Sequence, residues 1–481
     1  MKFHEPGPLD QAILNQLPHA DAVQANTLFA QELKRLDRKI VVLDDDPTGI
    51  QTVHGVHVYT DWQQSTMDEG FAEKNNLFFI LTNSRSFTVE QTLQCHKEIA
   101  QRIWNASQQS QKPFLLISRG DSTLRGHYPL ETETLRTELE HLGHPSYDAE
   151  ILIPFFPEGG RYTFGDIHYV LEKDHLVPAG LTEFARDKSF GYRSSHLGDF
   201  VAEKTLGHYR SNDCVFISLE ELAALDLDSI THKLQQTSHF QKVIVNATTY
   251  ADLKVFCAAL CRAIHSGKEF LFRSAAPLTK ILGGISDRPL LRRNDLIDPN
   301  NTNGGIILVG SHVNKTSRQL EALHTSEYPI RFLEFNQHLV LTPGGLEGEV
   351  KRVVTEASDA ITNGQTVAVY TRRDRFDLPD PDPDKQLEVS VRISDSVTSI
   401  ISKLPVRPSF IIAKGGITSS DVGVKALQVH CATVMGQLRP GVPVWMTGSE
   451  SRFPNLPYVI FPGNVGEDST LKEIVELLIG R

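Results

Sequence analysis

Near its C-terminal end the chain reads Ile411-Ile-Ala-Lys-Gly-Gly-Ile-Thr-Ser-Ser-Asp421, an apolar run that stops at two glycines and leads into a helix-like stretch. This order is typical of a strand, a tight turn and a helix, the repeating unit of α/β proteins. Because glycine has no Cβ, backbone N–H groups of such a turn can approach an anion closely, and the following helix N-terminus favours negative charge. The spacing is not that of a Walker P-loop. The turn therefore indicates a phosphate site, and a tight turn without a ligand is the alternative.

The same alternation of short apolar runs and helix-like stretches continues along most of the chain. It predicts an α/β fold of two domains, each built on a mostly parallel sheet flanked by helices. We expect a helical extension over 1–38, a first domain over 39–285, a linker over 286–303 and a second domain over 304–481. The expected strands are 39–43, 77–81, 114–117, 150–153, 214–217, 242–245 and 270–272, then 305–309, 330–334, 366–370, 410–413, 442–446 and 458–461.

Length and composition exclude several classes of protein. A chain of 481 residues is too long for one hydrophobic core. Its net charge of −11 argues against nucleic acid or an anionic membrane as a partner. No apolar run approaches the ~20 residues of a membrane span. The N-terminus has no signal-peptide core, the five cysteines have no zinc spacing, and the 19 histidines form no metal pattern. We therefore expect a cytoplasmic protein with reduced thiols and no protein-built metal site.

Polar residues follow several of the expected strands in the first domain. Asp44, Asp45 and Asp46 come directly after an apolar run, and the carboxyl ends of strands are where open α/β sheets bind ligands. Three adjacent carboxylates repel one another unless a cation, a substrate hydroxyl or other donors compensate. The sequence predicts a functional acidic cluster here, with a solvated acidic turn as the alternative.

Arginines follow two other strands of this domain. Ser84 and Arg85 come after the 77–81 run, and a guanidinium group matches the geometry of a carboxylate. Arg161 and Thr163 follow the 150–153 run through a proline- and glycine-rich loop. These residues predict contacts to an anionic ligand, with a helix cap, a surface arginine and a structural loop as the alternatives.

The loop after the 114–117 run is the richest in polar groups. Asp121, Ser122, Thr123 and Arg125 lie between two glycines and supply an acceptor, two hydroxyl groups and a cation. That combination suits the binding of a polyhydroxylated acid, because a loop that only caps a helix rarely contains so many kinds of polar group.

The second half contains three glycine turns, each between a strand and a helix. The parallel arrangement places such turns at one edge of the sheet, so together they indicate a nucleotide site more strongly than one turn does. The turns are Gly310-Ser311, Gly415-Gly416 and Gly463-Asn464.

Taken in order, these blocks resemble the four-carbon acid sugar kinase family, whose members join an N-terminal sugar-acid-binding domain to a C-terminal nucleotide-binding domain. The resemblance covers roughly residues 39–475, and its most specific element is Asp-Ser-Thr-Leu-Arg-Gly. The matching blocks are Asp45-Asp-Pro-Thr-Gly49, Ser84-Arg85, Asp121-Ser-Thr-Leu-Arg-Gly126, Phe156-Pro-Glu-Gly-Gly-Arg161, Gly310-Ser311, Gly415-Gly-Ile-Thr418 and Gly463-Asn-Val-Gly466.

The resemblance implies ATP-dependent phosphorylation of a hydroxyl group on a small sugar acid such as threonate, erythronate or a 3-oxo-tetronate. It implies a site in the cleft between the domains, a Mg²⁺ ion on the nucleotide phosphates and, by family habit, a homodimer. Its catalytic carboxylates would be Asp45, Asp46 and Asp121; its acid-binding residues Ser84, Arg85, Ser122, Thr123, Arg125 and Arg161; and its ATP-binding residues Ser311, Gly415, Gly416, Ile417, Thr418, Gly463 and Asn464. The additional Asp44, Lys414 before the glycines and the N-terminal extension mark a divergent branch, so the resemblance does not identify the substrate.

Two other functions compete with this interpretation. Leu43 to Thr48 also fits the Asp-x-Asp-x-Thr signature of haloacid-dehalogenase-like phosphatases, with Asp44 as the nucleophile and Asp46 as the acid/base. That reading lacks a convincing downstream lysine and acidic pair, and it gives the second half of the chain no role. A two-domain ligand-binding protein without catalytic activity is the third possibility.

Overall fold

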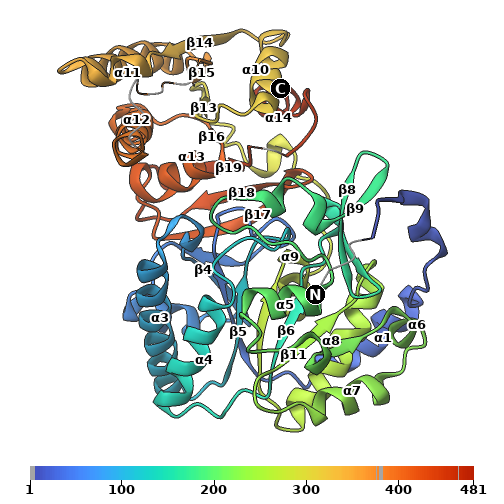
Figure 1. Cartoon of the computed structure of the whole chain (residues 1–481). Helices are drawn as coiled ribbons and strands as arrows, with labels where there is room; N and C mark the ends of the chain where they lie inside the picture. Colours follow the sequence, from blue (N-terminus) through green and yellow to red (C-terminus); the bar gives the residue numbers. More distant parts are fainter. Residues whose placement is uncertain (1–5, 375, 377, 379–382, 464, 481) are drawn as a thin grey trace. The chain divides into compact units, whose positions relative to one another are not determined.

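The computed structural model describes residues 6–374, 376, 378, 383–463 and 465–480. They form two compact units (Figure 1). The first comprises the chain up to Gly49 together with Asp61–Ser286, and the second comprises Ile50–Thr60 together with the chain from Asp287 onward. None of the helices in the described ranges combines the length and apolar character that a membrane span needs.

The first unit is built on a sheet of seven parallel strands. All six residues of β2 and all five of β4 are buried, as expected for strands covered on both faces. The order across the sheet is β10 (Val215–Ile217), β11 (Gln241–Val245), β6 (Ala149–Ile153), β12 (Phe270–Ser274), β5 (Phe114–Arg119), β2 (Lys39–Asp44) and β4 (Leu77–Leu81). The seven runs expected to be strands in this domain are therefore strands.

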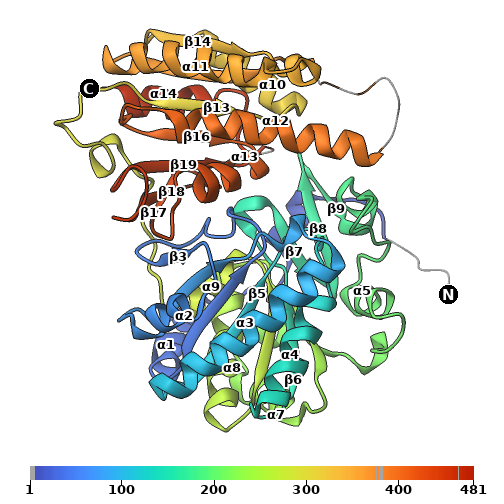
Figure 2. The same ribbon diagram turned by 90° about the vertical axis from the view of Figure 1, so that its left-hand side faces the viewer.

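Helices cover both faces of this sheet. Helices α3 and α4 pack together on one face, and α1, α7 and α8 pack on the other (Figures 1 and 2). Polar residues set several helix starts: Thr88 and Gln91 form a capping box at α3, and Thr249 and Asp252 form one at α8. The helices are α1 (Ala22–Leu33), α2 (Gln64–Ala72), α3 (Val89–Ser110), α4 (Leu130–Leu142), α5 (Leu197–Lys204), α6 (Leu219–Ala223), α7 (Leu227–Gln236), α8 (Tyr250–His265) and α9 (Ala276–Leu282).

A small antiparallel sheet belongs to the same unit. Its order is β1 (Leu9–Asp10), β9 (His175–Pro178), β8 (Ile167–Glu172) and β7 (Arg161–Phe164). The N-terminal extension is therefore not entirely helical: it supplies the short strand β1 and a 3-10 helix (Gln11–Gln16) before α1.

The second unit contains an eight-stranded sheet. Five strands are parallel, and the hairpin β17–β18 and β3 continue the sheet in antiparallel fashion. The order is β3 (His57–Tyr59), β17 (Cys431–Arg439), β18 (Val442–Thr447), β19 (Pro457–Phe461), β16 (Ile411–Lys414), β13 (Ile306–Val309), β15 (Thr366–Thr371) and β14 (Ile330–Phe335). Strand β3 lies within the range that the sequence assigned to the first domain, but it pairs with β17 of the second unit.

Helices also cover both faces of the second sheet. Helices α10 and α14 lie on one face and α11, α12 and α13 on the other (Figure 1). The core includes Leu291, Leu296 and Ile297, so the segment expected to be a linker packs into this unit. The helices are α10 (Asn314–His324), α11 (Gly345–Thr362), α12 (Pro383–Lys403), α13 (Gly416–Asp421) and α14 (Thr470–Ile479), and a π-helical turn (Val422–Ala426) follows α13. Each unit is therefore a mostly parallel sheet flanked by helices, which confirms the predicted fold class.

Candidate functional site

The first group of predicted site residues lies where β5, β2 and β4 end side by side. Arg85 follows β4 and binds both carboxylate oxygens of Asp45, with Nη2–Oδ1 at 2.7 Å and Nε–Oδ2 at 3.1 Å. Its third nitrogen, Nη1, lies 3.3 Å from Oδ2 of Asp46. Arg119, the last residue of β5, contributes a second guanidinium 3.3 Å from Asp45 and 3.0 Å from Asp44. Two arginines therefore compensate the three adjacent aspartates.

The three aspartates differ in ionisation because their surroundings differ. Burial opposes the charge of Asp46, but Arg85 and the Thr48 N–H, 2.8 Å from Oδ1, hold its pKa below the ordinary value. Asp44 is 1% exposed, and burial together with its two acidic neighbours raises its pKa to about 7 against the opposing charge of Arg119. Asp46 is therefore an anion at neutral pH, whereas the surroundings of Asp44 favour its protonated form.

The position of Asp44 bears on the phosphatase hypothesis. A Cβ atom at Gly49 would lie 2.2 Å from both carboxylate oxygens of Asp44, so the loop folds back tightly over this side chain. A phosphatase nucleophile must be ionised and open to its substrate. Asp44 is not accessible, so the described residues give no support to the phosphatase interpretation.

The loop after β5 forms the second group. Oδ2 of Asp121 accepts from Nε of Arg125 at 2.7 Å and from the hydroxyl of Thr123. Burial opposes the charge of Asp121, but Arg85 and Arg125 hold its pKa well below the usual range. Because Arg85 acts on both Asp45 and Asp121, the two acidic groups share one electrostatic environment.

Three side chains from other elements hold the backbone carbonyl groups of this loop. His168 is buried, its pKa is lowered to about 4, and the neutral ring must donate from Nε2 because a carbonyl only accepts. The contacts are His168 Nε2 to Ser122 O (2.8 Å), Tyr192 Oη to Thr123 O (2.7 Å) and Arg273 Nη2 to Arg125 O (2.8 Å). The loop that carries Ser122 and Thr123 is therefore fixed by groups far away in sequence.

Two further predicted residues occupy different places around this loop. Ser84 is buried, and its hydroxyl lies 3.1 Å from Thr82 and 3.5 Å from Glu131. Glu131 in turn binds Arg273 at 3.0 Å, so Ser84 belongs to the buried support of the site. Arg161 is the first residue of β7, and its charge interacts with Asp121 and Arg125.

Several of these groups are not marked by a local sequence pattern. Arg119, Glu131, His168, Tyr192 and Arg273 were not singled out, because none lies in a glycine-flanked polar block. Gly120 is the sequence feature that points to Arg273, because a Cβ at this position would lie 1.7 Å from Nη1 of Arg273. The glycine therefore marks a close side-chain approach rather than a contact to a ligand.

In the second unit, the three glycine turns follow the adjacent strands β13, β16 and β19. A Cβ at Gly310 would lie 2.4 Å from Oγ1 of Thr418, and one at Gly463 would lie 3.4 Å from Oγ of Ser311. Gly415 has φ +123°, and its Cβ would lie 3.2 Å from Cβ of Ser311. The turns thus meet around Ser311 and Thr418. Gly416 begins α13; Asn464 lies outside the described residues, as does the side chain of Ile417.

Two cationic side chains support these turns. Lys414, at the end of β16, is fully buried; its Nζ lies 2.5 Å from Pro462 O and 3.2 Å from Gly463 O. Burial and the nearby Lys315 lower its pKa to about 7. Arg373, which the sequence analysis did not identify, donates from Nη2 to Ser311 O at 2.7 Å.

A preformed metal cage is not found among the residues that the structure describes, where no three His, Cys, Asp or Glu residues are placed to hold an ion. Mg²⁺ commonly binds through substrate phosphates and only one or two carboxylates.

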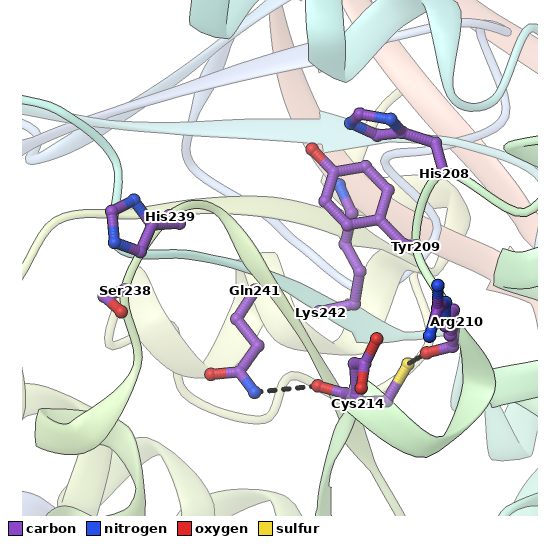
Figure 3. Close-up of a pocket in the computed structure, with 9 residues that line it drawn as sticks. His208, Tyr209, Arg210, Cys214, Ser238, His239, Gln241 and Lys242 are labelled. Carbon is purple, nitrogen blue, oxygen red and sulfur yellow. Dashed lines mark hydrogen bonds between the residues drawn. The ribbon is translucent and has the colours of Figure 1, made fainter.

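A cavity of about 190 Å³ in the first unit contains none of the predicted site residues (Figure 3). It lies beside the amino ends of β10 and β11, the edge of the sheet opposite to the aspartates. Its lining is His208, Tyr209, Arg210, Asp213, Cys214, Ser238, His239, Gln241 and Lys242. The candidate site is therefore not this cavity.

Comparison with known proteins assigns the two halves separately. Residues 40–282 match the family described as "Sugar-binding N-terminal domain", and residues 306–471 match "Nucleotide-binding C-terminal domain". No curated protein matches the chain.

Two solved structures share the fold. One is a Haemophilus influenzae protein of family DUF1537, with a TM-score of 0.59 and 16% sequence identity. The match covers 91% of this chain and 99% of the Haemophilus influenzae chain. The other is a protein from Salmonella typhimurium LT2, with a TM-score of 0.62 and 14% sequence identity. The match covers 90% of this chain and 97% of the Salmonella typhimurium chain. With both domain families matched in order, the chain belongs to the family that joins a sugar-binding N-terminal domain to a nucleotide-binding C-terminal domain, the architecture of the four-carbon acid sugar kinases.

Proposed function

We propose that this chain is an ATP-dependent kinase that phosphorylates a hydroxyl group of a small sugar acid of about four carbons, such as threonate, erythronate or a 3-oxo-tetronate. The observation that carries the proposal is the alternation of carboxylates and guanidinium groups from Asp45 through Arg85 to Asp121 and Arg125, at the carboxyl ends of β2, β4 and β5. A sugar acid presents hydroxyl groups that need acceptors and a carboxylate that needs a cation. This set of residues supplies both.

Asp121 is the carboxylate best suited to orient the reacting hydroxyl group. In the described part of the chain, both oxygens of Asp45 and both oxygens of Asp46 already accept hydrogen bonds. Asp121 uses only Oδ2 for its contacts to Arg125 and Thr123, so Oδ1 remains to accept a hydroxyl proton. A positioned carboxylate of this kind is the acceptor that phosphoryl transfer to an alcohol requires.

The nucleotide would lie against the turns at Ser311, Gly415–Thr418 and Gly463. The three turns meet around Ser311 and Thr418, and their glycines have no Cβ that would keep a phosphate away from the backbone. The Lys414 side chain holds the turn at Gly463 by donating a hydrogen bond to the carbonyl group of Gly463. A Mg²⁺ ion bound with the nucleotide would neutralise phosphate charge during transfer.

The proposal is tested by measuring ADP release from MgATP with each of D- and L-threonate, D- and L-erythronate and their 3-oxo forms. ADP release that depends on one acid would establish the activity and identify the substrate. Binding of ATP without acid-dependent release would move the search to other acids. Absence of ATP binding, with phosphate released from sugar phosphates, would contradict the kinase.

A further inference from the structure

Arg161 differs from the other arginines around the acidic cluster because it has no acidic partner. Arg85 and Arg119 bind the aspartates after β2, and Arg125 binds Asp121. Within the described ranges, the Arg161 guanidinium has no ion pair, and its Nε is buried without a hydrogen-bond partner. Unmade contacts of a partly buried cation are costly, so this group indicates an absent anion.

The backbone before Arg161 is shaped to admit its side chain. Gly160 has φ +74°, a backbone conformation that residues with a side chain rarely adopt. It turns the chain from the 3-10 helix Pro157–Gly159 into β7. A Cβ at Gly159 would lie 3.1 Å from Nη1 of Arg161 and 2.6 Å from the ring of Phe156. The Gly-Gly-Arg sequence therefore leaves room for the guanidinium to fold back over the turn.

An aromatic ring brings Arg161 close to Arg125. The guanidinium carbons of Arg125 and Arg161 lie 5.0 Å and 5.7 Å from the centre of the Phe184 ring, in the 3-10 helix Phe184–Arg186. Burial lowers the pKa of Arg161, and the charge of Arg125 lowers it further, while Asp121 opposes both effects. Arginine remains protonated in proteins, so two like charges lie against one ring, and of these two arginines it is Arg125 that forms an ion pair with Asp121. Arg125 also lies 3.9 Å from Oδ2 of Asp187, so within the described residues Arg125 has two acidic neighbours in ion-pair range and Arg161 has none.

We propose that Arg161 binds the carboxylate of the sugar acid, with Phe184 forming the wall of this subsite. The inference rests on the proposed function and adds the residue that distinguishes an acid from a neutral sugar. Arg85 is less suited to this role because all three of its guanidinium nitrogens already donate to Asp45 and Asp46. The guanidinium nitrogens of Arg161, including the buried Nε, make no hydrogen bond within the described residues, so Nε and an outer nitrogen are available for the paired hydrogen bonds that a carboxylate accepts.

Calorimetric titration of the full chain, without nucleotide, tests the subsite. The probes are D- and L-threonate, D- and L-erythronate, and the carboxamide of each, which keeps the hydroxyl groups and removes the charge. The wild-type chain should bind one acid more tightly than its carboxamide. Arg161→Met should lower the affinity for the acid about 10- to 100-fold and leave the affinity for the carboxamide unchanged, because only the charge-assisted hydrogen bonds are lost.

Two variants complete the design. Arg210→Met removes one exposed arginine at the opposite edge of the sheet and should bind the acid as the wild type does. Arg161→Lys keeps the charge without the planar guanidinium group. It should lower the affinity for the acid but not for the carboxamide, so it tests the subsite if Arg161→Met does not fold. Acid binding within about twofold of wild type in both Arg161 variants, or an equal loss for acid and carboxamide, overturns this inference and leaves the kinase standing. Failure of every acid to bind the wild-type chain overturns the proposed substrate class and this inference together.

Discussion

Arg85 holds Asp45 through both carboxylate oxygens, at 2.7 Å and 3.1 Å, while Asp45 is 4% exposed. From the sequence, this arginine is expected to bind an anionic group of the substrate, because it follows a strand and its guanidinium group matches the geometry of a carboxylate. The pairing shows that its immediate partners are two aspartates of the protein. Arg85 thus allows Asp45 and Asp46 to remain charged side by side at the end of a buried strand.

Removal of Arg85 should destabilise the first unit. In Arg85→Met, Asp45 would keep only its contact to Arg119, and a buried carboxylate that loses its partner typically costs about 3 kcal/mol. The double variant Arg85→Met/Asp45→Asn should recover part of that loss, because the unpaired charge is gone. Urea denaturation of both variants measures the difference, and equal stability of the single and double variants would show that the pair contributes little.

Asp121→Asn should abolish turnover while ATP still binds. The amide keeps the shape but cannot accept the hydroxyl proton, so we expect a loss of at least about 100-fold in kcat. Calorimetry with ATP checks that the second domain is intact. Asp213→Asn, beside the cavity in Figure 3, is the matched control and should keep wild-type turnover. Full activity in Asp121→Asn would place the substrate site elsewhere.

Gly310→Ala should weaken nucleotide binding about 10-fold or more. The new Cβ would lie 2.4 Å from Oγ1 of Thr418, so the turn that carries Thr418 must move. Gly348→Ala, in α11, meets nothing within 4 Å and controls for the substitution itself. Titration with ATP compares the two variants, and sugar-acid binding should be unchanged in both. Normal ATP affinity in Gly310→Ala would contradict the proposed nucleotide site.

Asp44 should give the first unit an unusual dependence of stability on pH. Its pKa is raised to about 7, so between about pH 4 and pH 7 the folded state holds a proton that the unfolded state has lost, and stability falls as the pH rises. Asp44→Asn stays neutral and should gain about 1 to 4 kcal/mol of unfolding free energy relative to wild type across that window.

Asp46→Asn is the internal control for this pH effect, with the opposite sign. Arg85 and Thr48 hold the pKa of Asp46 low despite its burial, so its charge stabilises the fold above the ordinary pKa and that contribution disappears in acid. Asp46→Asn should therefore lose stability at neutral pH and approach the wild type as the pH falls. Denaturant titrations at several pH values measure both variants; parallel curves for the two would show that neither carboxyl has a shifted pKa.

Local patterns predicted most of the fold. Each of the thirteen runs expected to be strands coincides with a strand to within two residues at either end. Twelve of these strands have parallel neighbours, and most of them are buried on both faces and therefore largely apolar. The elements that were missed have a different composition. Strand β17 alternates partly buried and buried residues, and β3 is three residues long, so neither forms a continuous apolar run. β7 begins in the stretch interpreted as a proline- and glycine-rich loop, and no strand was predicted where β8 and β9 lie.

The sequence by itself determined which residue types end each strand, and with them the acids, the hydroxyl groups and the glycine turns, because these are properties of short stretches. Only the tertiary structure decided which charges meet. It pairs Arg85 with Asp45, brings His168 and Arg273 to the loop after β5, and leaves Arg161 without an acid beside Phe184. These partners are separated along the chain by many tens of residues. Their contacts arise from the order of strands in the sheet, and a strand's own sequence does not record its neighbour.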